Sequence, residues 1–384
     1  MNEHELSKLL RGADVPVINH HPLPRYSIAE QDYGMTIGVA VTAGGRIYAC
    51  WVGGGDNANA FFLLAYSDDD GATWSEPILA IDPHDESLGC RRCTIVGTLW
   101  VDPRNRLWLF FNQSMEHFDG SSSNWAIRCD NPDSDERSWT KPQYIFYGCT
   151  LNKPIVTRKG EWLLPVSIWK RHLIRPPFTE CFHELDLLRM ANIMVSTDEG
   201  ETWTRRGGVS FIDSLFDEHM FVELSDDDRL WMMGRTAEHG LLQTWSPDAG
   251  KSWSAPEPAV PQSVSARFHL RKLASGRLLL IKHGKTLEKA APDRRELTAF
   301  LSEDDGQTWS DGFLLDERFE ISYPDSDQKA DGSIYITYDR NRAIDGEILI
   351  CKLREEDILA GKLVSEGSYL RHIAIKPGKL IQGD

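Results

Sequence analysis

The sequence lacks several features that would point to a membrane or secreted protein. It has no run of about 18 apolar residues, so we expect no transmembrane helix. The opening stretch, MNEHELSKLLRG, has no apolar segment of the kind that a secretory signal needs. We therefore expect a cytoplasmic protein, or a secreted one if a signal peptide was trimmed from the mature chain.

Cysteine is scarce, with seven residues scattered along 384. An odd and dispersed set argues against a disulfide framework. The stretch CRRC, from Cys90 to Cys93, has the C-x-x-C spacing, but a zinc site of this type needs a second pair and the sequence has none. We therefore expect free thiols, no metal and no cofactor.

Basic residues are in deficit, since 42 Lys and Arg face 58 Asp and Glu and give a formal net charge of -16. A strongly acidic surface repels the phosphate backbone of nucleic acids. Neither a nucleic acid nor a membrane is therefore expected as a partner.

One eight-residue pattern is present four times, as SDDDGATW, STDEGETW, SPDAGKSW and SEDDGQTW, starting at Ser67, Ser196, Ser246 and Ser302. A weaker copy lies in residues 129–142. Each copy follows a short apolar run and precedes a polar turn, which predicts a strand, a turn and a strand. Its Ser and Asp can bond backbone amides, its Gly permits positive φ and its Trp can pack under the turn. We interpret these boxes as structural.

A second pattern, a turn followed by an apolar strand, recurs six times: GGRIYACW, RNRLWLFF, KGEWLLPV, DDRLWMMG, SGRLLLIK and DGSIYITY. Their spacing is about 50 to 67 residues, and repeats of this length are typical of solenoids, propellers and arrays. Few segments have helical periodicity. The pattern predicts an all-β protein, a six-bladed β-propeller of four-stranded antiparallel blades forming one domain over residues 1–384. The last repeat, EILICKL, lacks an outer strand, and we expect residues 15–28 to supply it.

In a propeller the inner strands line a central channel, so a site should lie where the chain enters these strands or leaves the second strands. The candidates for substrate binding at these positions are Arg91, Arg92, Lys153, Arg267, His269 and Asp325. The chain leaving the second strands contributes Asp56, Gln113, Trp169, Arg235, His283 and Asp339.

The boxes resemble the Asp-box of the sialidases, and the resemblance to that glycoside hydrolase superfamily covers nearly the whole chain. The stretch DEHMFVELSDDDRLWMMGR is similar to the family pattern N-E-x-x-V-V-E-L, turn, Arg, which implies that Glu218 and Arg235 are site residues. The stretch SYPDSDQKADGSIYITYD is similar to the pattern containing the family's catalytic tyrosine, which implies that role for Tyr323.

The resemblance also implies a second substrate-binding arginine, Arg294 in RRELTAFLS, with Arg295 as the alternative register. It implies an acid/base aspartate upstream of the first box, where Asp56 lies. One family element is missing. The arginine of the motif R-I-P would fall at Gly34–Met35, where no arginine stands.

Together these residues predict a retaining exo-glycosidase of sialidase type that acts on an acidic sugar. A neutral tyrosine avoids the repulsion that a carboxylate nucleophile would meet at a sugar carrying a carboxylate on its reacting carbon. Tyr323 would attack, Glu218 would take its proton, and Asp56 would protonate the leaving oxygen. Arg235 and Arg294 would hold the carboxylate through their planar guanidinium groups.

Two other hypotheses stay open. A polysaccharide lyase acting on uronic acids would use the same propeller, with Tyr323, His219 and His269 as base and acid. A non-catalytic carbohydrate-binding propeller would keep the fold and carry out no reaction. In each case the partner is an oligosaccharide or a glycoside.

Overall fold

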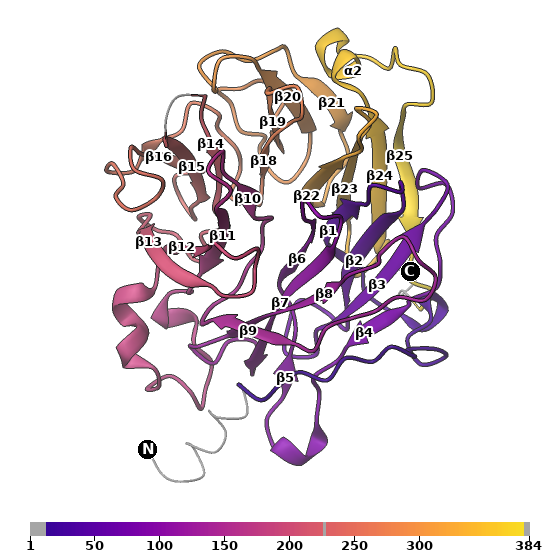
Figure 1. The fold of residues 1–384 in the computed structure, drawn as a ribbon, viewed down its shortest axis with the longest axis vertical. Coiled ribbons are helices and arrows are strands. Elements are labelled where there is room, and N and C mark those ends of the chain that lie inside the picture. Colours follow the sequence, from indigo (N-terminus) through magenta and orange to yellow (C-terminus); the bar gives the residue numbers. More distant parts are fainter. Residues whose placement is uncertain (1–12, 226–227, 380–384) are drawn as a thin grey trace.

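Six antiparallel sheets surround a central axis in a computed structural model that describes residues 13–225 and 228–379 (Figure 1). The predicted domain limits, 1–384, extend beyond the described residues at both ends. Inner strands of neighbouring sheets lie side by side, since β1 contacts β6 and β22, and β18 contacts β14 and β22. The predicted six-bladed propeller with four-stranded antiparallel blades is therefore confirmed.

The first three blades take the chain from Met35 to Val209. Blade 1 contains β1 (Met35–Val41), β2 (Ile47–Gly53), β3 (Phe61–Ser67) and β4 (Leu79–Ile81). Blade 2 contains β6 (Gly97–Val101), β7 (Leu107–Met115), β8 (Ser123–Cys129) and β9 (Gln143–Phe146), and the short β5 (Arg92–Cys93) pairs with the end of β7. Blade 3 contains β10 (Ile155–Val156), β11 (Trp162–Ser167), β12 (Ala191–Ser196) and β13 (Thr204–Val209).

The other three blades follow in the same order from the axis outward. Blade 4 contains β14 (Met220–Glu223), β15 (Leu230–Arg235), β16 (Leu241–Ser246) and β17 (Glu257–Pro258). Blade 5 contains β18 (His269–Lys272), β19 (Leu278–His283), β20 (Leu297–Ser302) and β21 (Phe313–Asp316). Blade 6 contains β22 (Ile321–Gln328), β23 (Ile334–Arg340), β24 (Glu347–Leu353) and β25 (Tyr369–Ile375).

The helical segments are short and lie between strands. They are η1 (Ile28–Glu30), η2 (Glu86–Leu88), η3 (Arg171–Leu173), η4 (His183–Leu188) and α2 (Glu355–Ala360). Over the described ranges, no helix has the length and apolar character that crossing a membrane requires.

Apolar side chains fill the spaces between neighbouring blades. Between blades 2 and 3, the ring of Trp162 meets those of Trp100 and Trp108 edge-on, at centroid distances of 4.7 and 5.9 Å. Such aromatic contacts add about 0.5–1.5 kcal/mol each to the burial of apolar area. The middle strands β2, β12 and β19 are buried along their whole length because both of their faces pack against other blades.

The four boxes form the turns between the third and fourth strands of blades 1, 3, 4 and 5. In each box the Ser hydroxyl accepts a hydrogen bond from the Gly amide, at 3.0, 2.8, 2.7 and 2.8 Å. In the first box the Trp74 indole donates to the carbonyl oxygen of Gly71 (3.0 Å). Gly71 has φ of 87°, and a Cβ there would lie 2.7 Å from the Tyr369 hydroxyl of blade 6. The glycine is therefore needed for its conformation and for the contact between blades.

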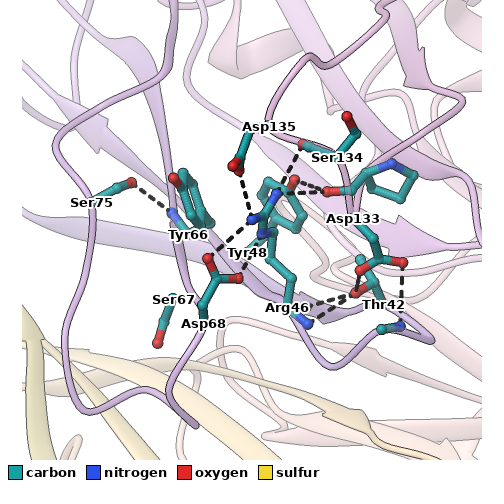
Figure 2. Close-up of polar contacts among 12 residues, drawn as sticks. Thr42, Arg46, Tyr48, Tyr66, Ser67, Asp68, Ser75, Asp133, Ser134 and Asp135 are labelled. Carbon is teal, nitrogen blue, oxygen red and sulfur yellow. Dashed lines mark hydrogen bonds and ion pairs between the residues drawn. The ribbon is translucent and has the colours of Figure 1, made fainter.

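The weaker fifth copy joins blade 2 to blade 1 through Arg46 (Figure 2). The Arg46 guanidinium donates to both carboxylate oxygens of Asp68 (2.7 and 3.0 Å) and to Asp135 (2.9 Å). It also donates to the carbonyl oxygen of Ser134 (2.9 Å) and stacks on the ring of Tyr66 at 4.4 Å. This buried arginine fastens the first box to residues 132–135, which supports a structural role for both turns.

The last blade closes differently from the sequence-based expectation. Its outer strand is β25, in which Ile375 pairs with Ile348 of β24. Residues 15–28 instead lie beside blade 1, where Asn19 forms a bridge with Ala80 of β4. The prediction that the N-terminal segment supplies the outer strand of blade 6 is therefore wrong. The chain turns back after α2 and returns along β24, so one continuous C-terminal segment completes the blade.

Candidate active site

A cavity of about 220 Å³ lies at one mouth of the central channel. Its walls come from the chain that enters the inner strands or leaves the second strands. The lining residues are Asp56, Ile95, Val96, His117, Leu151, Trp169, Phe216, Glu218, Arg235, Arg294, Tyr323 and Arg342. All five residues that the sequence analysis assigned to the reaction and to the carboxylate therefore meet in one hollow.

Tyr323 and Glu218 form a hydrogen-bonded pair at the centre of this cavity. The Tyr323 hydroxyl donates to Oε1 of Glu218 at 3.2 Å, although the two residues are 105 positions apart. Nη1 of Arg235 lies 3.0 Å from each carboxylate oxygen of Glu218. The Glu218 side chain is buried, with 1% of its surface exposed, so the arginine compensates a carboxylate that water cannot reach.

The backbone of both residues adopts a conformation that non-glycine residues rarely have. Glu218 has φ of 45° and Tyr323 has φ of 52°. Tyr323 lies where the pairing of β22 with β23 shifts, between Ser322 and Asp325. Such strain costs roughly 1–3 kcal/mol per residue and is found mainly at functional sites. Here the strained backbone directs the phenol and the carboxylate toward each other.

The surroundings change the acidity of this pair. Burial raises the pKa of Tyr323, and the Glu218 carboxylate raises it further, while Arg342 and Arg235 oppose the shift. Burial acts to lower the pKa of Arg235, but the Glu218 carboxylate and the Tyr323 phenol together outweigh it and the net shift is upward. Tyr323 is therefore a neutral phenol at neutral pH, next to a carboxylate that can accept its proton.

Arg294 lies beside Tyr323, and its Nη1 donates to the hydroxyl of Ser322 at 2.8 Å. Arg295, the alternative register, pairs instead with Asp293 and stacks on the ring of Phe319 at 3.7 Å. Arg294 is thus the member of the pair that lines the cavity.

Arg342 is a cavity residue that the sequence analysis missed. Its guanidinium lies 4.3 Å from the ring centroid of Tyr323, and its Nε donates to Asp339 at 2.9 Å. Its carbonyl oxygen accepts from the amide of Gly34 at 3.0 Å, so it lies beside the point where the family's first arginine is missing. A Cβ at Gly34 would clash with the carbonyl oxygen of Gly346, which explains why no side chain stands there. The only sequence signal was its place, three residues after Asp339 in the stretch YDRNR.

Asp56 lies at the outer rim of the cavity. Half of its side chain is exposed (51%), and its Oδ2 is 3.5 Å from Nη1 of Arg342. Next to it His117 also lines the wall, and burial lowers the pKa of this histidine, which keeps the ring neutral near pH 7. A partly solvated carboxylate on the rim can exchange protons both with solvent and with a group bound in the cavity.

Residues 45–336 match the family model of the BNR repeat-like domain. The chain belongs to this family. No curated protein matched the sequence. Among solved structures, the propeller is similar to the Hadza microbial sialidase Hz136, with 17% identity, a TM-score of 0.63, and 86% of this chain and 67% of that chain covered.

Two further solved structures share the fold. The intramolecular trans-sialidase from Ruminococcus gnavus, in complex with oseltamivir carboxylate, is 12% identical with a TM-score of 0.65, over 89% of this chain and 98% of that chain. Trypanosoma rangeli sialidase, as a covalent intermediate with 2,3-difluorosialic acid, is 18% identical with a TM-score of 0.58, over 80% of this chain and 52% of that chain. At these identities the likeness concerns the fold, so the chain is a sialidase-like BNR propeller.

Four of the residues predicted to bind substrate do not line the cavity of this BNR propeller. Lys153, Arg267, His269 and Asp325 instead form an axial cluster, in which the other three side chains all face Asp325. Asp325 is two residues beyond Tyr323 on β22, and a strand advances about 6–7 Å over two residues. The axial cluster therefore lies deeper along the channel. Lys153 and His269 face a second cavity, of about 240 Å³, lined by β10, β14 and β18.

Arg91 and Arg92 do not line the cavity either. Arg91 is exposed, and its backbone amide donates to Glu116. The Arg92 side chain turns away and bonds the carbonyl oxygen of Pro83 (3.0 Å) and the carboxylate of Asp14 (3.2 Å). The prediction that Arg91 and Arg92 bind substrate at the mouth of the channel is not supported by their contacts.

The histidines assigned to a lyase reaction are also outside the cavity. Nε2 of His219 lies 2.9 Å from the carbonyl oxygen of Asn192, and His269 belongs to the axial cluster. Burial lowers the pKa of His269 to about 4. Neither histidine is among the residues that line the cavity around Tyr323, so the lyase hypothesis loses the partners that it assigned to Tyr323.

Proposed function

We propose that this protein is a retaining exo-glycosidase of sialidase type, which removes a terminal sugar that carries a carboxylate on its anomeric carbon. The contact of the Tyr323 hydroxyl with Glu218, at 3.2 Å inside a cavity that also contains three arginines, is the observation that carries the proposal. A phenol beside a buried carboxylate is an activated nucleophile without charge of its own. Three cations around it suit a substrate with a carboxylate next to the reacting centre.

In the first step, the Tyr323 oxygen forms a bond to the anomeric carbon while the bond to the leaving oxygen breaks. The phenolic proton passes to Glu218, and Asp56 in its protonated form gives its proton to the leaving oxygen. In the second step, Asp56 takes a proton from water, the water oxygen attacks the anomeric carbon, and the tyrosyl bond breaks. Glu218 then returns the proton to Tyr323, and the configuration at the anomeric carbon is retained.

Arg342 is assigned the task of the missing family arginine. With Arg235 and Arg294 it faces the cavity, so a bound carboxylate can meet three guanidinium groups. In the free protein Arg342 contacts Asp56 at 3.5 Å. A substrate carboxylate that pairs with Arg342 would take over this interaction and leave the Asp56 side chain free to turn toward the leaving oxygen.

The proposal is tested with the 4-methylumbelliferyl glycoside of sialic acid and with 2,3-difluorosialic acid. We expect the wild-type chain to release the fluorophore from the glycoside. With 2,3-difluorosialic acid, Tyr323 should bond to the anomeric carbon as the fluorine on that carbon leaves as fluoride, so the protein should gain the mass of the inhibitor less HF. Tyr323→Phe should give neither signal, and Glu218→Gln should slow release by about 100-fold or more, as expected for loss of a proton acceptor.

The alternatives give different outcomes. A lyase would leave the sialoside intact and, when given an oligosaccharide of uronic acids, would form an unsaturated product that absorbs in the ultraviolet. A non-catalytic binding propeller would bind the sugar and release no fluorophore. Release by Tyr323→Phe at the wild-type rate would contradict the assignment of the nucleophile.

A further inference from the structure

Arg267 occupies an unusual position behind the reacting pair. It precedes β18 of blade 5, and only 1% of its surface is exposed. Its guanidinium lies 5.5 Å from the ring centroid of Tyr323. The sequence analysis placed this residue among the substrate-binding groups, but it is not part of the cavity wall. A buried charge at this place needs another explanation.

The contacts of Arg267 connect four blades. Its Nε donates to Oδ1 of Asn152 at 2.9 Å, and its Nη2 donates to the carbonyl oxygen of Leu151 at 2.8 Å, both at the entry to blade 3. Nη2 also lies 3.7 Å from Oδ1 of Asp325, on the strand of blade 6 that carries Tyr323. The fourth blade is reached through Asn152.

Asn152 extends this connection to Glu218. Its amide nitrogen donates to the carbonyl oxygens of Glu218 and His219, at 3.0 Å each. The Asn152 side chain is buried, so these bonds are shielded from water. They hold the backbone at the residue where φ is 45°, a conformation that persists only if its surroundings enforce it.

Asp325 fixes the other end. Its Oδ2 accepts from the amide of Val39 at 2.9 Å and also contacts Lys153. Because Asp325 lies two residues after Tyr323, beyond the irregularity in β22, its position determines how far that strand extends toward the cavity. One arginine thus links the strand of the nucleophile to the loop of the proton acceptor.

We propose that Arg267 and Asn152 form a positioning bridge that sets the approach of Tyr323 to Glu218, without either residue touching the substrate. This inference rests on the proposed function, since it concerns the same reacting pair. A guanidinium donates from separate nitrogens held in one rigid plane, whereas the three N–H groups of an ammonium diverge from a single nitrogen at the end of a flexible chain. Replacing Arg267 by Lys keeps the positive charge beside Asp325. It removes the planar group that bonds Asn152 and Leu151 while it faces Asp325.

The chain offers a matched control in Arg271. It lies on β18 and, like Arg267, ties blade 5 to β22, since its Nη1 donates to Asp327 and to the carbonyl oxygen of Ser326, both at 2.8 Å. It faces the second cavity and makes none of the contacts that lead to Glu218. Arg271→Lys therefore removes an equivalent inter-blade arginine without disturbing the bridge.

The experiment follows the labelling of Tyr323 by saturating 2,3-difluorosialic acid through the intact mass of the protein. It measures the rate constant of labelling and its amplitude, which is the fraction of the protein that becomes labelled. For Arg267→Lys and Asn152→Ala we expect the rate constant to fall roughly 10- to 100-fold, because small misplacements of reacting groups cost that much. The amplitude should stay complete, KM for the 4-methylumbelliferyl sialoside should change less than about 3-fold, and Arg271→Lys should label like wild type.

The outcomes separate the two proposals. Wild-type protein that is not labelled would contradict the proposed function. Labelled wild-type protein together with a wild-type rate constant in both bridge variants would contradict the bridge alone. A variant could instead have a lower melting temperature and a lower labelling amplitude while its rate constant stays at the wild-type value. That result would show that the replaced residue is merely structural, and it would also overturn the inference. Asn152→Ala keeps the test decisive if Arg267→Lys folds poorly.

Discussion

Arg342 is held against the Tyr323 ring by carboxylates from two ends of the chain. Asp339 accepts from its Nε at 2.9 Å, and Asp56 of blade 1 lies 3.5 Å from its Nη1. Its Nη2 is buried and finds no hydrogen-bond partner among the residues that the structure describes. A buried donor of this kind costs free energy unless a ligand satisfies it. The residue is therefore prepared to receive an anionic group, which the proposed substrate carries.

Replacing Arg342 by Met should impair the turnover of acidic sugars. A hydrogen bond to a charged group contributes about 1.5–3 kcal/mol, so we expect kcat/KM for the 4-methylumbelliferyl sialoside to fall by about 10- to 100-fold. The control is Arg340→Met, because Arg340 pairs with Asp345 (2.6 Å) and Glu347 (3.2 Å) and does not line the cavity. Equal kcat/KM for the two variants would exclude Arg342 from the binding of the carboxylate.

The residues of the cavity differ in how far the sequence could predict them. Glu218, Tyr323 and Arg235 lie in extended motifs with fixed offsets from a turn, so their meeting in one hollow could be predicted. Arg342 lies past the end of a strand, outside any motif, and only the fold brings it beside Gly34. Arg267 and Asp325 were placed at the mouth because sequence position near a strand end does not give depth along the channel. The shift in pairing within β22 is equally invisible in the sequence.

Among the elements, β25 decides whether blade 6 is complete. Burial in this strand is confined to its end, since Ile375 is 2% exposed whereas Ile373 is 43% exposed. Ile375 packs into a cluster that includes Tyr26 and Trp51 of the N-terminal part of the chain. The amide of Gly378 then donates to the carbonyl oxygen of Ile28 at 3.0 Å. The two ends of the described chain therefore meet at this strand.

Ile375→Ala should destabilise the fold by about 2–5 kcal/mol, the usual cost of removing a buried isoleucine side chain down to its Cβ. Ile373→Ala makes the same chemical change on the same strand and should cost far less, since 43% of that residue is already exposed to water. Urea denaturation of both variants measures the difference. Similar losses for the two would mean that β25 does not cover the core as described.

The repeats explain why blades were predictable as elements while the closure was not. Each turn and its flanking strands are local in sequence, and the boxes recur with the same hydrogen bonds. The partner of the last strand, in contrast, can come from either end of the chain. Residues 369–375 carry few of the turn signals that mark the other blades, and the helix α2 separates them from β24.

At the scale of the whole molecule, the ring depends on the junction between blades 1 and 6. Asp70, in the first box, accepts hydrogen bonds from Tyr335 (2.6 Å) and Lys352 (2.8 Å) of blade 6. The Tyr369 hydroxyl of the same blade donates to the carbonyl oxygen of Asp70 (2.6 Å). These bonds cross the seam between the first and last parts of the chain, so they should contribute to stability wherever Asp70 is ionised.

This junction predicts a pH dependence with a defined sign. The Lys352 ammonium, followed by the Tyr335 hydroxyl, lowers the pKa of Asp70 from its ordinary value of 3.8 to about 2. The stabilisation is therefore fully present above pH ~4 and is lost as the pH falls toward ~2. Because 42% of the Asp70 side chain is exposed, solvent screening limits the contribution to about 1 kcal/mol. Asp70→Asn should lower the melting temperature at pH 7, and the gap to wild type should close between pH ~4 and ~2.

The control is Asp305→Asn. Asp305 holds the same position in its own box, but it accepts hydrogen bonds from the amide and the hydroxyl of Ser225 (2.8 and 2.9 Å) instead of bonds from blade 6. This variant should therefore lower the melting temperature less than Asp70→Asn does at pH 7. A gap between Asp70→Asn and wild type that stays constant down to pH ~2 would show that the carboxylate charge does not hold the ring closed.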